Sequence, residues 1–285
     1  MDIKILEHCI SCGRCARVCP SGVFTQAKKG ETVSVSKPEN CIRCGHCVAA
    51  CPAAAVEHEV FPPEKVHPID RSQLPTPESL MLLIRSRRSN RDLSRRPVPR
   101  ELLEQIVEAA HRAPTASNLQ QVEFTIVSNP DELRAVIEFT LDYMRQMVKL
   151  LEMPIVGSLA RRLVKGADRY AATFRRILQE WDEEQRDRIL RGATALLLIH
   201  TPAKNRFGAI DAQLAYQNGS LMAEALGVSQ IYTGFLITAL KADKSGKLAR
   251  KLGIRGTIHA GMALGMPAST WGNYIDKEPL KAEWR

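Results

Sequence analysis

The stretch HCISCGRCARVCPSG, residues 8–22, is followed by a near copy of itself, NCIRCGHCVAACPAA, at residues 40–54. Each copy spaces four cysteines as CxxCxxCxxxC and places a proline directly after the fourth. These are all eight cysteines of the 285-residue chain, and they lie within its first 51 residues. The thiols therefore indicate a small N-terminal unit that binds metal or carries out redox chemistry.

Three chemistries use cysteines in such numbers. Disulfides are typical of exported proteins, but the N-terminal MDIKILEHC has no basic stretch followed by an apolar run, so we expect reduced thiols and a cytoplasmic location. Zinc also binds four thiolates, although zinc ribbons separate their two CxxC pairs by a longer loop. Four cysteines within eleven residues, twice over, favour iron–sulfur clusters, with zinc as the alternative.

The repeated CxxCxxCxxxCP run resembles the bacterial two-cluster ferredoxins over about residues 1–60. In that family each [4Fe-4S] cube takes three thiolates from one half of the repeat and the fourth from the other half. The resemblance implies that one cluster is held by Cys9, Cys12, Cys15 and Cys51, and the other by Cys41, Cys44, Cys47 and Cys19. Gly13 and Gly45 would permit the sharp turn between thiolates, and Pro20 and Pro52 would end each short helix.

The remainder of the chain is long enough for a second domain. The composition of the whole chain, 45% hydrophobic with a net charge of +9, supports a core, and the absence of 18 consecutive apolar residues predicts no membrane span. Between Val60 and Glu78, five prolines fall within nineteen residues, which is typical of a tether. We therefore expect a ferredoxin domain at residues 1–60, a proline-rich linker at 61–76 and a second domain at 77–285.

Helical and strand patterns alternate in this second domain. Strands are predicted at residues 122–129, 193–201 and 257–267. Helices are predicted around residues 80–84, 102–110, 131–191 with a break near 153–157, and 209–227. Strands separated by helices indicate an α+β or α/β fold. His200 and His259 fall within apolar, strand-like runs, so we expect core residues rather than catalytic ones.

Seven arginines lie between Arg85 and Arg100. They suit a solvated helix end, a basic arm for nucleic acid, or an anion site for a phosphorylated cofactor, because guanidinium forks match phosphate oxygens. No aromatic residue interleaves with them, which weakens the nucleic-acid interpretation. No GxGxxG follows a strand, and no HExxH is present. We expect neither a nucleic-acid nor a membrane partner.

Four motifs in order resemble the FMN-dependent nitroreductase family over about residues 77–285. They are RSRRSNRDL at 85–93, AAHRAPTASNLQQVEFTIV at 109–127, NGSLMAEALGVSQIYTGF at 218–235 and AGMALGMP at 260–267. The whole chain resembles the subgroup that has a two-cluster ferredoxin fused ahead of the flavin domain. The resemblance implies an α+β protein in which a small ferredoxin-like domain precedes a nitroreductase fold with a mixed sheet flanked by helices. It also implies FMN, two [4Fe-4S] clusters and a homodimer.

The resemblance assigns residues near the start of the domain to the flavin. Arg87, Ser89 and Arg91 match the family's RxSxR/K motif, whose residues grip the FMN phosphate and the pyrimidine edge of the flavin. Asn118 matches the asparagine that hydrogen-bonds the flavin ring; its alternative is a helix cap or turn residue. A cation near the flavin would favour its negatively charged reduced form.

Further assignments concern the end of the domain. Thr233 and Gly234 match the pair whose backbone amides approach flavin N5, and Lys277 lies near the family's C-terminal basic residue on the phosphate. No catalytic side chain beyond this N5 region is assigned. Many members have Pro-Trp where this chain has Gln121 and Val122, and the usual C-terminal arginine pair is missing. We therefore expect a different pocket wall and different phosphate contacts.

Residues 150–181 are expected to roof the pocket, with Tyr170, Phe174 and Trp181 lining it; simple packing of an amphipathic helix pair is the alternative. Four arginines in this segment would either steer an anionic substrate or be solvated on a helix surface. They are Arg161, Arg162, Arg175 and Arg176.

These expectations combine into one functional hypothesis. Electrons from a low-potential donor such as ferredoxin enter through two clusters, collect on FMN and leave to a small organic acceptor, namely a nitroaromatic, a quinone or an activated alkene. The first alternative is an electron carrier or flavin partner that serves another enzyme without a substrate of its own. The second is an iron–sulfur sensor that binds nucleic acid through its arginines.

Overall fold

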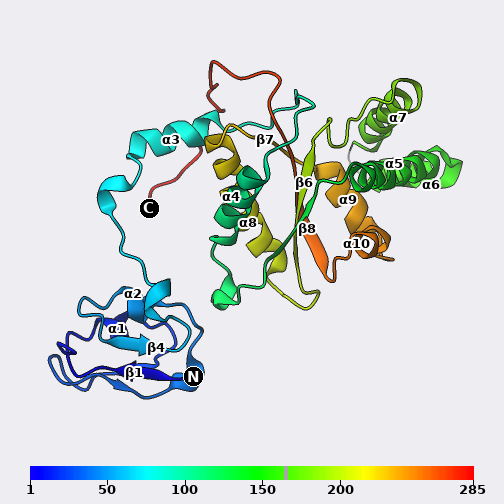
Figure 1. Cartoon of the computed structure of the whole chain (residues 1–285). Helices are drawn as coiled ribbons and strands as arrows, with labels where there is room; N and C mark the ends of the chain where they lie inside the picture. Colours follow the sequence, from blue (N-terminus) through cyan, green and yellow to red (C-terminus); the bar gives the residue numbers. More distant parts are fainter. Residues whose placement is uncertain (164–165) are drawn as a thin grey trace. The chain divides into compact units, whose positions relative to one another are not determined.

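The computed structural model describes residues 1–163 and 166–285 (Figure 1). The chain divides into two compact units. The first contains Met1–Pro75 with Ala116–Leu119, and the second contains Thr76–Thr115 with Gln120–Arg285. The boundary between Pro75 and Thr76 falls within the proline-rich segment.

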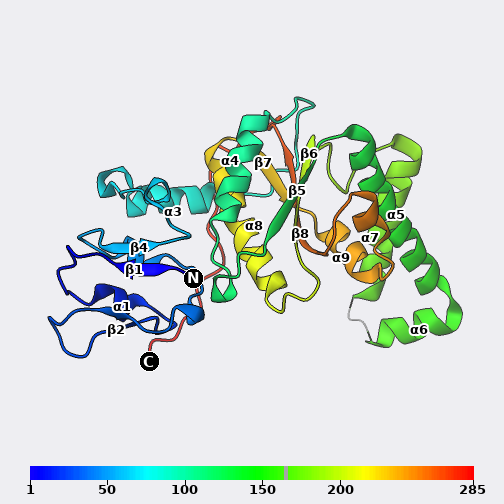
Figure 2. The same cartoon turned by 60° about the horizontal axis from the view of Figure 1, so that its bottom comes forward.

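The first unit consists of short strands and helices that repeat once (Figure 2). Its elements are β1 (Ile3–Ile5), α1 (Arg14–Val18), β2 (Phe24–Thr25), β3 (Ser34–Val35), η1 (Pro38–Asn40), α2 (His46–Ala49), β4 (Val56–His58), η2 (Pro63–Lys65), η3 (Arg71–Gln73) and η4 (Ala116–Asn118). β1 pairs antiparallel with β4, and β2 pairs antiparallel with β3. Ile3, Val23, Phe24, Val33 and Val56 form the core together with the buried thiols of Cys15 and Cys47.

Two glycines make the turns that start α1 and α2. Gly13 and Gly45 both adopt left-handed backbone conformations, with φ of 68° and 73°. A side chain at Gly13 would be strained there, and its Cβ would lie 2.0 Å from Oε1 of Gln26. The glycines therefore let each helix begin immediately after the second cysteine of its repeat.

The second unit is built on a four-stranded sheet in the order β5-β6-β8-β7. Its elements are α3 (Pro77–Ser86), α4 (Arg100–His111), β5 (Glu123–Val127), α5 (Pro130–Glu152), α6 (Pro154–Leu163), α7 (Ala167–Glu184), β6 (Ala195–Thr201), α8 (Gly208–Ala225), β7 (Ser229–Tyr232), α9 (Gly234–Ala242), α10 (Lys247–Lys251) and β8 (Thr257–Gly265). The three strand pairs are antiparallel. An isolated parallel bridge joins Ser89 to Gln230 of β7.

The central strand β6 shows why the sheet is covered on both faces. All seven of its residues are buried, as its continuous apolar sequence predicts. Leu196 and Leu198 pack into one core with residues of α5, α7 and α9, whereas Leu197 and Ile199 pack into a second core with residues of α4 and α8. Figure 1 shows these helices on opposite sides of the sheet. The unit is thus a three-layer α+β structure.

Helix ends follow local chemistry. The Asn129 side chain accepts from the N–H groups of Asp131 and Glu132 at the start of α5. Met153 ends this helix, and Pro154 starts the next at its first position, so the expected break near residues 153–157 is present. The short elements β7, α9 and α10 were not predicted from the sequence.

The two histidines of the sheet belong to its hydrogen-bonding structure. His200 Nε2 lies 3.0 Å from Thr125 Oγ1, and His259 Nε2 lies 2.9 Å from Thr201 Oγ1. Burial lowers the pKa of both imidazoles. His200 is buried as expected, and His259 is half-buried. No helix within residues 1–163 and 166–285 is long and apolar enough to cross a membrane.

Candidate functional site

Seven of the eight thiols fall into two groups within the first unit. Cys19, Cys41, Cys44 and Cys47 line one small cavity, so the last cysteine of the first repeat lies with three cysteines of the second. Burial raises the pKa of the Cys15 thiol, and the neighbouring Cys51 and Cys9 act in the same direction. Cys51 of the second repeat therefore lies near cysteines of the first, while Cys12 is half-buried in the turn before Gly13.

Backbone amides point at several of these sulfurs. The N–H groups of Val23, Arg43 and Ala55 donate to the sulfurs of Cys19, Cys41 and Cys51 at 3.3, 3.3 and 3.2 Å. Such donors stabilise thiolates, which are the ligands of iron–sulfur clusters. This donor set fits [4Fe-4S] clusters.

Without metal, the most buried thiols resist ionisation. Burial raises the pKa of the Cys47 thiol to about 11, and the Val48 N–H opposes that rise. Because clusters bind the thiolate, assembly must displace this proton at neutral pH.

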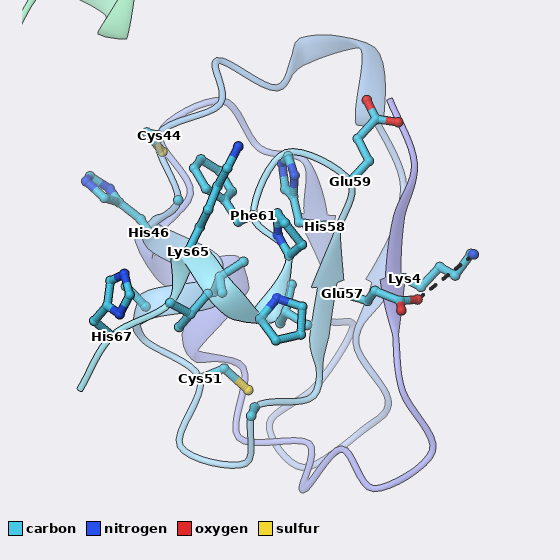
Figure 3. Close-up of a pocket in the computed structure, with 18 of the residues that line it drawn as sticks. Lys4, Cys44, His46, Cys51, Glu57, His58, Glu59, Phe61, Lys65 and His67 are labelled. Carbon is cyan, nitrogen blue, oxygen red and sulfur yellow. Dashed lines mark ion pairs between the residues drawn. The ribbon is translucent and has the colours of Figure 1, made fainter.

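One histidine lies directly beside a thiol of the second repeat. His58, at the end of β4, is 2% exposed, and its Nε2 lies 3.5 Å from Cys41 Sγ. The Val60 N–H donates to His58 Nδ1 at 3.2 Å, and the Phe61 ring lies 4.8 Å away. Because Nδ1 accepts a hydrogen bond, the imidazole carries its proton on Nε2 and donates it toward the sulfur. Figure 3 shows His58 and Phe61 in the groove between β4 and the following segment.

The second unit contains a pocket of about 740 Å³ with an aromatic wall. Tyr143 of α5, Tyr170 and Phe174 of α7 and Phe235 of α9 line it. The Phe174 ring lies 6.5, 6.4 and 6.0 Å from the rings of Tyr143, Tyr170 and Phe235, respectively. These separations are typical of packed aromatic side chains, so the wall suits a flat organic ligand.

Three arginines, Arg91, Arg188 and Arg191, also line this pocket, and no acidic residue among those described does. Arg188 forms an ion pair with Glu180, whereas the Arg191 guanidinium has no hydrogen bond or ion pair with any residue that the structure describes. Burial lowers the pKa of Arg191, the charges of Arg91 and Arg188 add to that effect, and the charges of Asp187 and Glu180 oppose it. We call this group of three the arginine cluster.

The loop that carries two of these arginines is anchored by one carboxylate. Asp187 accepts hydrogen bonds from the N–H groups of Ile189, Leu190 and Gly192 at 2.8, 2.9 and 2.9 Å. Ile189 and Leu190 are buried in the core. Arg191 has a φ of 59°, a left-handed conformation that costs free energy in a residue with a side chain. Asp187 therefore holds the loop in a strained shape that directs Arg191 to the pocket.

The RxSxR segment is fixed along the edge of β7. The Tyr216 hydroxyl donates to Gln230 Oε1 at 2.7 Å, and Gln230 Nε2 donates to the Arg88 carbonyl at 3.1 Å. Arg87 lies near Tyr216: burial raises the pKa of this tyrosine, and the Arg87 charge opposes the rise. The segment thus leads from Arg87, beside Tyr216, past the Ser89 bridge to Arg91 in the pocket.

Thr233 and Gly234 also line the pocket, where β7 passes into α9. The Thr233 N–H already donates to the Gly261 carbonyl at 3.0 Å. The Gly234 N–H is the first of α9 and has no backbone acceptor among the described residues. Of the pair expected near flavin N5, Gly234 is therefore the one whose amide is available.

Four other expected flavin residues, namely Arg87, Ser89, Asn118 and Lys277, do not line this pocket. Within the first unit, the Asn118 amide donates to the carbonyl oxygens of Ile42 and Arg43 at 3.1 and 2.8 Å. Lys277 is exposed in the C-terminal tail. Their roles toward flavin remain predictions.

The tail itself packs against the arginine-rich segment. The Arg85 Nη1 group donates to the Tyr274 hydroxyl at 3.4 Å, and Arg88 stacks over Trp271 at 5.8 Å. Aromatic residues therefore occupy the tail that lacks the family's arginine pair.

Only some of the residues expected to cover the pocket from the segment 150–181 line it. Tyr170 and Phe174 line the pocket, but Trp181 instead packs on the core and beneath Arg134. Arg175 and Arg176 pair with Glu152 and Glu180 on helix surfaces, and Arg162 is exposed. The Arg161 side chain lies outside the described residues. The pocket's cations come from the arginine cluster, and DRILRG before a buried strand was the only sequence signal for Arg188 and Arg191.

Comparison with family models agrees with the division of the chain into two units. Residues 84–266 match the nitroreductase family, and residues 1–52 match a 4Fe-4S dicluster domain. The chain belongs to the nitroreductase family and carries a 4Fe-4S dicluster domain ahead of its nitroreductase domain.

Among curated proteins, 72 residues are 35% identical to iodotyrosine deiodinase 1 of Rattus norvegicus. The match covers 24% of this chain and 25% of that protein, so the chain spans about a quarter of the relative's length.

Solved structures share the fold of the second unit. An FMN-bound nitroreductase from Desulfitobacterium hafniense aligns with a TM-score of 0.53 at 21% identity, over 71% of this chain and 97% of that one. An FMN-bound nitroreductase from Bacteroides fragilis aligns with a TM-score of 0.51 at 22% identity, over 71% of this chain and 95% of that one.

Proposed function

We propose that this protein is an FMN-dependent oxidoreductase that receives electrons through two [4Fe-4S] clusters and delivers them in pairs to a small organic acceptor. The observation that carries the proposal is the occurrence in one chain of thiols grouped for clusters and of the arginine- and aromatic-lined pocket beside Gly234. Clusters pass single electrons, whereas bound flavin stores two. A protein with both can collect single electrons from a donor and transfer them two at a time to an acceptor.

The protein's own residues suit that flavin in distinct ways. Arg87, which lies near Tyr216, would bind the phosphate by charge-assisted hydrogen bonds, and Arg91, which lines the pocket, would lie at the pyrimidine edge. The Gly234 amide is a free donor for N5. We propose one FMN per chain and a homodimer, as the resemblance implies.

With a nitroaromatic acceptor, the proposed reaction is a two-electron reduction of the nitro group. Two electrons from two reduced ferredoxin-type donors and two protons from water convert R–NO₂ into R–NO and H₂O. The aromatic wall of the pocket beside Gly234 suits a flat organic acceptor as well as the flavin, and this favours an enzyme over a carrier.

The test is anaerobic reoxidation. The purified protein, reduced with dithionite, is mixed with a nitroaromatic, a quinone or an activated alkene while flavin absorbance is followed. We expect at least one class to restore oxidised FMN with two electrons per acceptor molecule. Arg87→Ala, with weakened FMN binding, is the control. Protein that contains no FMN, or reduced flavin that no acceptor reoxidises, would refute the proposed function.

A further inference from the structure

The arginine cluster requires an explanation beyond the binding of FMN. Arg91, Arg188 and Arg191 face one pocket that no described acidic residue lines, and Arg191 has no hydrogen-bonding or ionic partner among the described residues. The charges of Asp187 and Glu180 offset part of the repulsion from the two neighbouring arginines, but neither carboxylate forms an ion pair with Arg191. The half-buried guanidinium therefore keeps its hydrogen-bond donors open to an anion in the pocket. The loop also maintains the left-handed conformation of Arg191 through three hydrogen bonds to Asp187. These hydrogen bonds fix the backbone from which the Arg191 side chain reaches the pocket.

The aromatic residues of the same pocket indicate what else the anion contains. Tyr143, Tyr170, Phe174 and Phe235 present packed rings to the same pocket. Rings favour a planar apolar body, while a guanidinium fork matches the two oxygens of a carboxylate. We propose that the acceptor is an aromatic carboxylate and that Arg191 binds its carboxylate group, an inference that rests on the proposed function.

Bound FMN is the other source of negative charge in this pocket, through its phosphate and its reduced ring. The two sources differ in what they predict for Arg191. If its anion is the flavin, loss of the guanidinium weakens FMN binding and affects every acceptor alike. If its anion is the acceptor's carboxylate, loss of the guanidinium lowers kcat/KM only for acceptors that carry a carboxylate.

The experiment compares 4-nitrobenzoate with its uncharged methyl ester in the full-length protein. We expect Arg191→Gln to lower kcat/KM for 4-nitrobenzoate by about ten- to a hundredfold, as for loss of a charge-assisted hydrogen bond, and to leave the ester unaffected. The matched control is Arg186→Gln, because Arg186 lies next to the same loop, is exposed and pairs with Glu184. FMN affinity should be unchanged in Arg191→Gln and reduced in Arg87→Ala.

A binding measurement separates this inference from the proposed function. Benzoate should perturb the absorbance of oxidised flavin in the wild type at concentrations at least tenfold lower than in Arg191→Gln, and benzamide should not distinguish the two. This result would stand even if no nitro compound were reduced. Equal losses with both acceptors, equal benzoate affinity in both proteins, or weakened FMN binding in Arg191→Gln would each overturn the inference.

A second and independent inference comes from His58. Its Nε2–H points at Cys41 Sγ, and the ring is fixed by the Val60 N–H and by Phe61. The equivalent position in the first repeat, seven residues after its fourth cysteine, is Gln26. Gln26 Nε2 instead donates to the carbonyls of Ser11 and Glu31, both at 2.8 Å. The two halves therefore differ in one side-chain donor to a thiolate.

A donor aimed at a ligand sulfur stabilises the extra negative charge of a reduced cluster. We infer that His58 makes the cluster held by Cys41 easier to reduce than its neighbour. In a singly reduced protein the electron would then reside mainly on the cluster held by Cys41, so electron transfer between the two clusters would favour that direction.

The test is an EPR-monitored redox titration of full-length protein. His58→Phe keeps a ring against Phe61 but removes the donor, so it should lower the reduction equilibrium constant of one cluster by about tenfold, which is about 59 mV for one electron. His58→Gln should recover part of the shift, and Gln26→Leu should not lower the same cluster's potential. The iron content per chain of each variant should be measured as a control, to establish that both clusters are present. Unchanged potentials in His58→Phe, or equal shifts of both clusters, would contradict the inference.

Discussion

Replacement of Cys19 by alanine is expected to remove the cluster bound by Cys41, Cys44 and Cys47 and to spare the other. The thiols of these four residues line one cavity, although Cys19 belongs to the first repeat. A cube deprived of one of its four thiolates loses a corner ligand, and the buried Cys47 thiol then regains its proton because its pKa is about 11. Anaerobic wild-type protein should contain about eight irons and eight sulfides per chain, and Cys19→Ala about half of each.

The matched variant is Cys51→Ala, which should remove the opposite cluster. Cys51 lies near Cys15 and Cys9, and its sulfur accepts the Ala55 N–H. His58 provides a marker: the cluster that survives in Cys51→Ala should be the one whose potential responds to His58→Phe. Loss of the first-repeat cluster in Cys19→Ala would disprove the crossed assignment, and tightly bound zinc in place of iron would disprove both.

Local patterns explain which elements could be predicted. The seven consecutive buried residues of β6 and the asparagine-capped start of α5 have strong signals in sequence. β7 has only four residues. One of them, Gln230, is polar, and its burial is possible because its side chain hydrogen-bonds the Tyr216 hydroxyl and the Arg88 carbonyl. A short strand whose stability comes from tertiary hydrogen bonds has no periodicity to detect.

The candidate site shows the same contrast. Cysteine spacing is a local property, so the thiols of both clusters could be identified from the sequence alone. Arg191 could not, because its role depends on a left-handed backbone, on Asp187 and on aromatic residues from three distant helices. Trp181 was a reasonable lining candidate by helical position, but it faces the core.

The second large effect concerns the route of electrons. If the clusters are the entrance, the Cys19→Ala/Cys51→Ala double variant should bind FMN normally, because the second unit has its own cores and the pocket residues lie within it. Reduced ferredoxin should then reduce the flavin at least ~100-fold more slowly than in the wild type, a barrier increase of about 2.7 kcal/mol. Dithionite, a small reductant, should reduce both proteins similarly.

The most direct test of the proposed function is anaerobic stopped-flow absorbance of the bound flavin in the wild type and in this double variant, after mixing with reduced ferredoxin, NADH or NADPH. We predict rapid flavin reduction by ferredoxin in the wild type only, and slow reduction by both nicotinamides in both proteins. Reduction by NADH or NADPH at catalytic rates, together with undiminished turnover in the double variant, would contradict the claim that electrons enter through the clusters.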